Sequence, residues 1–247
     1  LSLFKSYAIN LIKWKPAGFF KIVIFGQGRT GSTLLEDLLC STGYFTKNVE
    51  LLAARHGERK HPFQYIQRAA NSQGDINFIF HLKIHHLTTD ISIPVVPSIF
   101  LQRMKIYGWK IIYLSRQNQL KHSLSSVYAN KRERYNNRSR EKVQKIDVNC
   151  EEFIRLSKWR ERNDAKERKA LMGIEHLKLV YEESLQDSSV HQATADRILE
   201  YIGLPSKPVI TSYHKVITKH PKEIIMNYNE FYTMCVEKGW DKYLVKC

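Results

Sequence analysis

The sequence of 247 residues lacks any apolar run of about 18 residues, so we expect no transmembrane segment. It also lacks internal repeats, low-complexity linkers and CxxC pairs. Cysteine is scarce and widely spaced, at Cys40, Cys150, Cys235 and Cys247. This pattern favours the reduced thiols of a cytoplasmic protein over a disulfide framework or a zinc site.

The first residue is Leu1 and not Met, so an anchor or signal upstream of it stays open. Residues 1–15 mix large apolar side chains with lysines. We predict a helix packed on the domain there, with a membrane-surface helix as the alternative. The length fits one α/β domain at residues 1–247, with an N-terminal extension at residues 1–19 and a core at residues 20–247.

Acidic side chains are few: 24 Asp and Glu stand against 39 Lys and Arg, which gives a formal charge of +15. So large a surplus favours an anionic partner, such as a nucleic acid, an acidic membrane surface or a phosphorylated ligand. A nucleic-acid-binding module would add a recognised motif or aromatic residues clustered among the cations, and the sequence shows neither. We therefore expect no nucleic-acid partner.

Short apolar runs alternate with helical patterns along the chain. The runs predict buried strands at residues 21–25, 77–83, 110–114 and 177–181. Apolar residues at helical spacing predict helices at residues 32–39, 120–128, 150–172 and 193–202. Residues 131–140 are basic and are predicted to form a loop or lid. The alternation is typical of an α/β fold, and we predict a single P-loop-type domain with a central parallel β-sheet flanked by helices.

The strongest local motif follows the first predicted strand and precedes the first predicted helix. Glycines let backbone N–H groups turn inward, and the helix adds its positive N-terminus, so such a loop binds a phosphate without a metal. The motif begins with Gly26 and Gln27, and the residues predicted to contact a phosphate are Gly28, Arg29, Thr30, Gly31, Ser32 and Thr33.

This loop departs from the nucleotide-triphosphatase pattern G-x4-G-K-[ST] at one position. Gly26 and Gly31 match the pattern, but Ser32 replaces the lysine that reaches the β- and γ-phosphates. The cation is instead Arg29, early enough in the loop to lie along a 5'-phosphate and its leaving-group bridge. The arrangement favours a donor with one phosphate and one short transferable group over ATP.

The run Arg-Thr-Gly-Ser-Thr-Leu-Leu, which begins at Arg29, resembles the 5'-phosphosulfate loop of sulfotransferases that use 3'-phosphoadenosine-5'-phosphosulfate (PAPS). It looks closest to the bacterial branch that includes trehalose and nodulation-factor sulfotransferases. The resemblance implies PAPS as the donor, adenosine-3',5'-bisphosphate (PAP) as the product, and no metal.

A PAPS donor requires a second site, for its 3'-phosphate. The resemblance implies an arginine at a strand end, and Arg116 follows the predicted strand at residues 110–114. In the bacterial branch a serine lies nine positions further on, which selects Ser125 over its neighbours Ser123 and Ser126. An arginine fork and a serine hydroxyl suit a phosphate.

Residues 215–228 resemble the last nucleotide-binding stretch of the family. On this basis Lys219 and Lys222 are predicted to contact the nucleotide. A basic surface loop without such a contact stays the alternative.

The general base is predicted from the same resemblance. In the trehalose type a glutamate follows the loop arginine by about twenty residues and precedes two large apolar residues. Glu50, followed by Leu51 and Leu52, fits both conditions. Lys83, at a predicted strand end, would neutralise charge on the moving sulfuryl group or the leaving phosphate, unless it is an ordinary exposed lysine.

Other side chains compete with Glu50 for the role of base. Glu36 is the main rival carboxylate, and we expect it to face solvent or to cap the sheet. The histidines that could act as a base are His56, His81, His85 and His86.

These patterns predict a sulfotransferase that moves a sulfuryl group from PAPS to a hydroxyl or amine of a glycan or small natural product. A P-loop nucleotide kinase is one alternative, but it would need a loop lysine and a magnesium-binding carboxylate. A basic nucleic-acid-binding module is the other. We expect the acceptor pocket in loops at residues 51–71 and 131–148. The sequence leaves the acceptor and the oligomeric state open.

Overall fold

The computed structural model describes residues 19–48, 50–54, 57, 60–73, 76–131, 145–213 and 220–245. The chain divides into two compact units, the first comprising residues 1–115 and 166–211 and the second residues 116–165 and 212–247. A single domain at residues 1–247, with its core at residues 20–247, stays a prediction. The predictions for residues 1–18, His56, residues 132–144, Lys219 and Cys247 concern positions outside the described residues.

The first unit is built on five parallel strands in the order β2-β3-β1-β4-β5. The strands are β1 (Lys21–Phe25), β2 (Phe45–Lys47), β3 (Asn77–Leu82), β4 (Trp109–Ser115) and β5 (Leu177–Val180). Parallel strands buried on both faces read as continuous apolar runs, which is why the sequence predicts four of the five. The α/β class and the central parallel sheet flanked by helices are confirmed.

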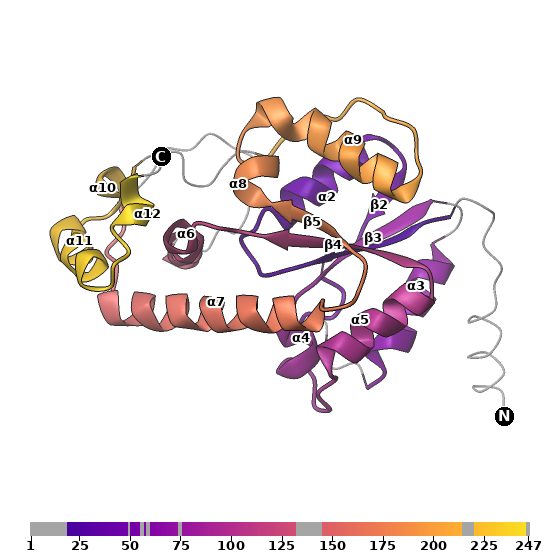
Figure 1. Cartoon of the computed structure of the whole chain (residues 1–247), viewed down its shortest axis with the longest axis horizontal. Coiled ribbons are helices and arrows are strands. Elements are labelled where there is room, and N and C mark those ends of the chain that lie inside the picture. The colour runs from indigo at the N-terminus through magenta and orange to yellow at the C-terminus, as the bar shows by residue number, and fades with distance from the viewer. Residues whose placement is uncertain are drawn as a thin grey trace. The chain divides into compact units, whose positions relative to one another are not determined.

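Helices cover both faces of this sheet (Figure 1). Those of the first unit are α2 (Ser32–Ser41), α3 (Pro62–Ser72), α4 (His85–Thr88), α5 (Pro97–Ile106), α8 (Tyr181–Ser184) and α9 (His191–Ile202), with a short η2 (Ser188–Val190). Successive side chains of a strand point to opposite faces. Ile22 and Ile24 of β1 therefore pack in one core with α2 and α9, whereas Val23 and Phe25 pack in another with α3 and α5.

The second unit has a core of its own. It contains α6 (Gln119–Lys131), most of α7 (Cys150–Ala170), α10 (Pro221–Ile224), α11 (Tyr228–Glu237) and α12 (Lys242–Val245). Its buried side chains include Leu124 and Tyr128 of α6, Phe153 of α7 and Phe231 of α11. Apolar packing therefore holds each unit together independently.

Helix α7 confirms the predicted helix at residues 150–172, apart from its last two residues. Its first turn carries Glu151 and Glu152 and its last turn Arg168 and Lys169, as the helix dipole favours. Asn149 caps it, because its Oδ1 accepts the Glu152 N–H at 3.0 Å. Across the part of the chain that the structure describes, no helix is both long and apolar enough to cross a membrane.

Helix α3 corrects the expectation of a loop at residues 51–71 over residues 62–71. Phe63 and Ile66 of this helix are buried against the sheet. These two side chains therefore serve the core, and an acceptor pocket in this stretch stays a prediction. The short strand β2 is also absent from the sequence prediction.

The described cysteines, Cys40, Cys150 and Cys235, are all free thiols, as predicted. Burial raises the pKa of both the Cys40 and the Cys235 thiol to about 12. These two side chains therefore stay protonated and behave as small apolar groups.

Candidate functional site

The loop between β1 and α2 is held by backbone contacts. The Gly26 N–H donates to the Leu82 carbonyl at 3.1 Å. Thr30 is buried and donates its hydroxyl to the Gln27 carbonyl at 2.8 Å, so a contact of Thr30 with an anion would come from its backbone N–H. Arg29 has a φ of 69°, in the left-handed region that costs a non-glycine residue about 1–2 kcal/mol. Such strain is typical of functional loops.

Helix α2 starts directly after this loop. Its N-cap is Gly31, no side chain caps its first turn, and that turn has no acidic residue. Ser32 and Thr33 are half-buried at this end. The N–H groups of the first turn and the positive end of the helix dipole therefore suit an anion.

Close packing explains two glycines of the loop. A β-carbon on Gly31 would lie 2.9 Å from the Tyr181 ring and 3.0 Å from Leu185. A β-carbon on Gly28 would lie 3.3 Å from the ammonium nitrogen of Lys83. Gly28 thus allows Lys83 to lie against the backbone of the loop.

The loop lies at the carboxyl edge of β1, next to the end of β3. Phe25 is opposite Leu82 in the β1–β3 register, so Gly26 and Lys83 leave the sheet side by side. The chain continues from β1 into α2 on one face of the sheet and from β3 to α5 on the other (Figure 1). Open parallel sheets bind their ligands at the point where the connections from two neighbouring strands leave on opposite faces.

Lys83 contacts Glu50, the predicted base. Its Nζ lies 2.6 Å from Glu50 Oε1, and the two side chains are 17% and 19% exposed. On the other carboxylate oxygen, His86 Nε2 lies 3.8 Å from Glu50 Oε2. The Lys83 backbone N–H donates to His86 Nδ1 at 3.2 Å, which assigns the ring proton to Nε2, on the side of Glu50. Glu50, Lys83, His86 and the loop are therefore brought together in the first unit.

His86 is the part of this arrangement that the sequence reasoning missed. It was one of four rival bases, whereas the structure makes it a partner of Glu50. His86 follows Lys83 by three residues, a helical spacing. This spacing is a signal that could have placed His86 near Lys83 and its partner Glu50.

One group of potential metal ligands occurs among the described residues. It consists of His85, His86 and Asp90, whose nitrogen and oxygen atoms lie within 4.8 Å of one another. The Nδ1 lone pair of His86 already accepts the Lys83 N–H. We therefore assign His86 to Glu50 and not to a metal.

The residues predicted for a 3'-phosphate belong to the second unit. Arg116 is its first residue, directly after β4. Ser125 lies in α6 and is 8% exposed. Their contact with a phosphate stays a prediction.

The two serines next to Ser125 are engaged by α7. Ser123 accepts a hydrogen bond from Ser157 at 2.9 Å, and Ser126 accepts one from Arg160. The same arginine, itself buried, lies 2.6 Å from His122 Nε2. These contacts fix α6 on α7.

Two lysines are predicted to contact the nucleotide. Lys222 is among the described residues, and Lys219 lies outside them. Lys222 is exposed in the first turn of α10, where its N–H donates to His220 Nδ1 at 3.2 Å. Its contact with a nucleotide stays a prediction.

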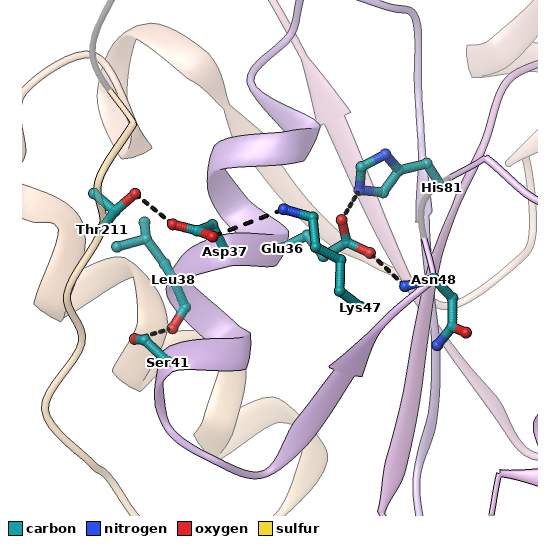
Figure 2. Close-up of polar contacts among 8 residues, drawn as sticks. All are labelled: Glu36, Asp37, Leu38, Ser41, Lys47, Asn48, His81 and Thr211. Carbon is teal, nitrogen blue, oxygen red and sulfur yellow. Dashed lines mark hydrogen bonds and ion pairs between the residues drawn. The ribbon is translucent and has the colours of Figure 1, made fainter. Parts of the chain in front are cut away.

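Glu36 corrects one expectation from the sequence. Its side chain is 0% exposed, so it does not face solvent. Its Oε1 accepts the N–H of Asn48, the first residue after β2, at 3.0 Å (Figure 2). It therefore caps the end of this strand, which was the other expectation.

No protein-family model matches the chain, and no curated protein matches it. Among solved structures, a sulfotransferase from Alicyclobacillus acidocaldarius is similar, with a TM-score of 0.49 and 14% identity over 91% of this chain and 94% of that chain. The sulfotransferase domain of the Synechococcus PCC 7002 olefin synthase has a TM-score of 0.43 and 12% identity over 79% of this chain and 76% of that chain. At identities this low, the function has to be inferred from the residues of the site.

The strained Arg29 leads to a prediction that separates stability from anion binding. Arg29→Gly relieves the left-handed strain and Arg29→Ala keeps it, so the glycine variant should be more stable by about 1 kcal/mol in urea unfolding. Both variants lose the guanidinium and should bind PAP at least about tenfold more weakly than the wild type by calorimetry. Wild-type affinity in both variants would exclude Arg29 from the site, and equal stability would contradict the strain.

Proposed function

We propose that the chain is a sulfotransferase that moves the sulfuryl group of PAPS to a hydroxyl or amine of a glycan or small natural product. One observation carries the proposal: the Lys83 ammonium lies 2.6 Å from Glu50 and also lies beside Gly28 of the phosphate loop. A donor loop, a cation and a candidate base thus meet in one site.

The loop between β1 and α2 would bind the 5'-phosphosulfate. Its N–H groups and the α2 N-terminus suit the 5'-phosphate, and Arg29 suits the oxygen that bridges phosphorus and sulfur. Ser32 stands where a triphosphatase has its lysine, which favours PAPS over ATP. Arg116 and Ser125 are proposed to bind the 3'-phosphate.

The transfer itself would follow an in-line path through a loose transition state. The acceptor oxygen or nitrogen bonds to sulfur while the bond from sulfur to the bridging oxygen breaks. That bond's electron pair leaves with the 5'-phosphate of PAP, and the proton of the acceptor passes to Glu50. Lys83 stabilises the negative charge on the sulfuryl group and on the leaving phosphate.

Lys83 would also couple donor binding to the base. Its ammonium pairs with Glu50 in the structure, and a sulfuryl group next to Gly28 would attract the same ammonium. When Lys83 turns to the donor, His86 would stay beside Glu50, with its Nε2 3.8 Å from Glu50 Oε2. Glu50 would then be left to accept the proton of the acceptor.

The donor assignment predicts a thermal-shift pattern. PAP should raise the melting temperature more than adenosine 5'-monophosphate does, because the 3'-phosphate adds charge-assisted bonds. Arg116→Ala should remove this difference and keep the response to the monophosphate. Stabilisation by ATP with Mg²⁺ and not by PAP would support a kinase, and salt-dependent DNA binding without a nucleotide response would support a nucleic-acid-binding module.

The base assignment predicts a selective loss of turnover. Glu50→Gln should lower kcat by about 10²–10⁴-fold and leave the Kd for PAP within about twofold, because it removes a proton acceptor and no phosphate contact. Glu175→Gln is the matched control, since Glu175 also pairs with a lysine, Lys105, at 2.5 Å but is 65% exposed. Wild-type kcat in Glu50→Gln on the true acceptor would show that Glu50 is not the base.

A further inference from the structure

Glu36 is a buried carboxylate on α2, the helix that follows the loop of the candidate site. Its Oε1 accepts the Asn48 N–H at 3.0 Å, and its Oε2 lies 3.4 Å from His81 Nε2, which is itself 3% exposed. Figure 2 shows the carboxylate of Glu36 between these two partners. Burying a carboxylate costs several kcal/mol unless its oxygens are paired. An apolar residue on this buried side of α2 would avoid that cost, so the two contacts need a reason beyond core packing.

The two partners of Glu36 belong to the segments that carry the proposed catalytic groups. Asn48 precedes Glu50 by two residues, and His81 precedes Lys83 by two residues. Asn48 is fixed further by its Nδ2, which donates to Gln73 Oε1 at 2.9 Å. A displacement of Asn48 or His81 would therefore move Glu50 or Lys83.

We propose that Glu36 is a positioning residue for the transfer reaction, an inference that rests on the proposed function. Because α2 starts at the phosphate loop, the one side chain of Glu36 ties this loop to the Glu50 segment and to the strand of Lys83. It touches neither donor nor acceptor in this role. A misplacement of the base by about 1 Å can lower a rate by about 10²-fold, so the effect of losing Glu36 is measurable.

Asp37, the next residue of α2, provides a matched control. It is 22% exposed, lies 3.7 Å from Lys47 Nζ and accepts a hydrogen bond from Thr211 at 2.7 Å (Figure 2). A part-exposed pair of this kind contributes little to stability. Asp37→Asn therefore changes a carboxylate on the same helix whose partners, Lys47 and Thr211, are not those of Glu36.

The test compares Glu36→Leu, Glu36→Gln and Asp37→Asn with the wild type. The measurements are kcat with PAPS, the Kd for PAP, the melting temperature, and the hydrogen-exchange rate of the Asn48 amide. Glu36→Leu should lower kcat at least about tenfold, leave the Kd within about threefold and speed exchange at Asn48. Glu36→Gln keeps one oxygen for the Asn48 N–H and should recover part of kcat, while Asp37→Asn should match the wild type throughout.

Two results would overturn the inference. The first is a wild-type kcat in Glu36→Leu. The second is a parallel loss of kcat, PAP affinity and melting temperature in that variant, as expected of a purely structural residue. If Glu36→Leu does not fold, Glu36→Gln decides: its kcat must fall while its PAP affinity and melting temperature hold. A wild-type chain that transfers nothing from PAPS would instead refute the proposed function, and this inference with it.

Discussion

The parallel pairing of β1 with β3 is the constraint on which the rest of the site depends. Because Phe25 lies opposite Leu82, Lys83 and the loop between β1 and α2 leave the sheet at the same edge. A slip of one residue would turn every side chain of the strand to the other face. Ile24 and Phe25 would then exchange the cores in which they are buried, so apolar packing holds the register and, with it, Lys83 against Gly28.

Charge reinforces this geometry. The chain has few acidic residues, yet two of them, Glu36 and Glu50, are buried or half-buried in the first unit. The Lys83 ammonium offsets the charge of Glu50, and the carboxylate of Glu36 accepts the Asn48 N–H. These contacts lower the cost of burying the two carboxylates.

The sequence predicted the parts of the fold whose signal is local. Four buried strands are continuous apolar runs, and the phosphate loop is marked by its glycines. Strand β2 has only three residues, and helix α3 mixes polar with apolar side chains, so neither gives such a signal. The family resemblance led to Glu50, but its contact with Lys83 joins segments far apart in the chain and needs the tertiary fold. Glu36 next to Asp37 reads as a polar helix face, and only the packing of α2 against β2 and β3 reveals its burial.

A transfer assay with PAPS that carries radioactive sulfur tests the central claim most directly. The wild-type chain is incubated with pooled glycans and hydroxylated or amino natural products, without added metal, and the products are identified by mass spectrometry. We expect labelled sulfur to move to an acceptor as an equal amount of PAP appears. Unchanged PAPS with every acceptor pool, together with transfer of the γ-phosphate of ATP in the presence of Mg²⁺, would contradict it.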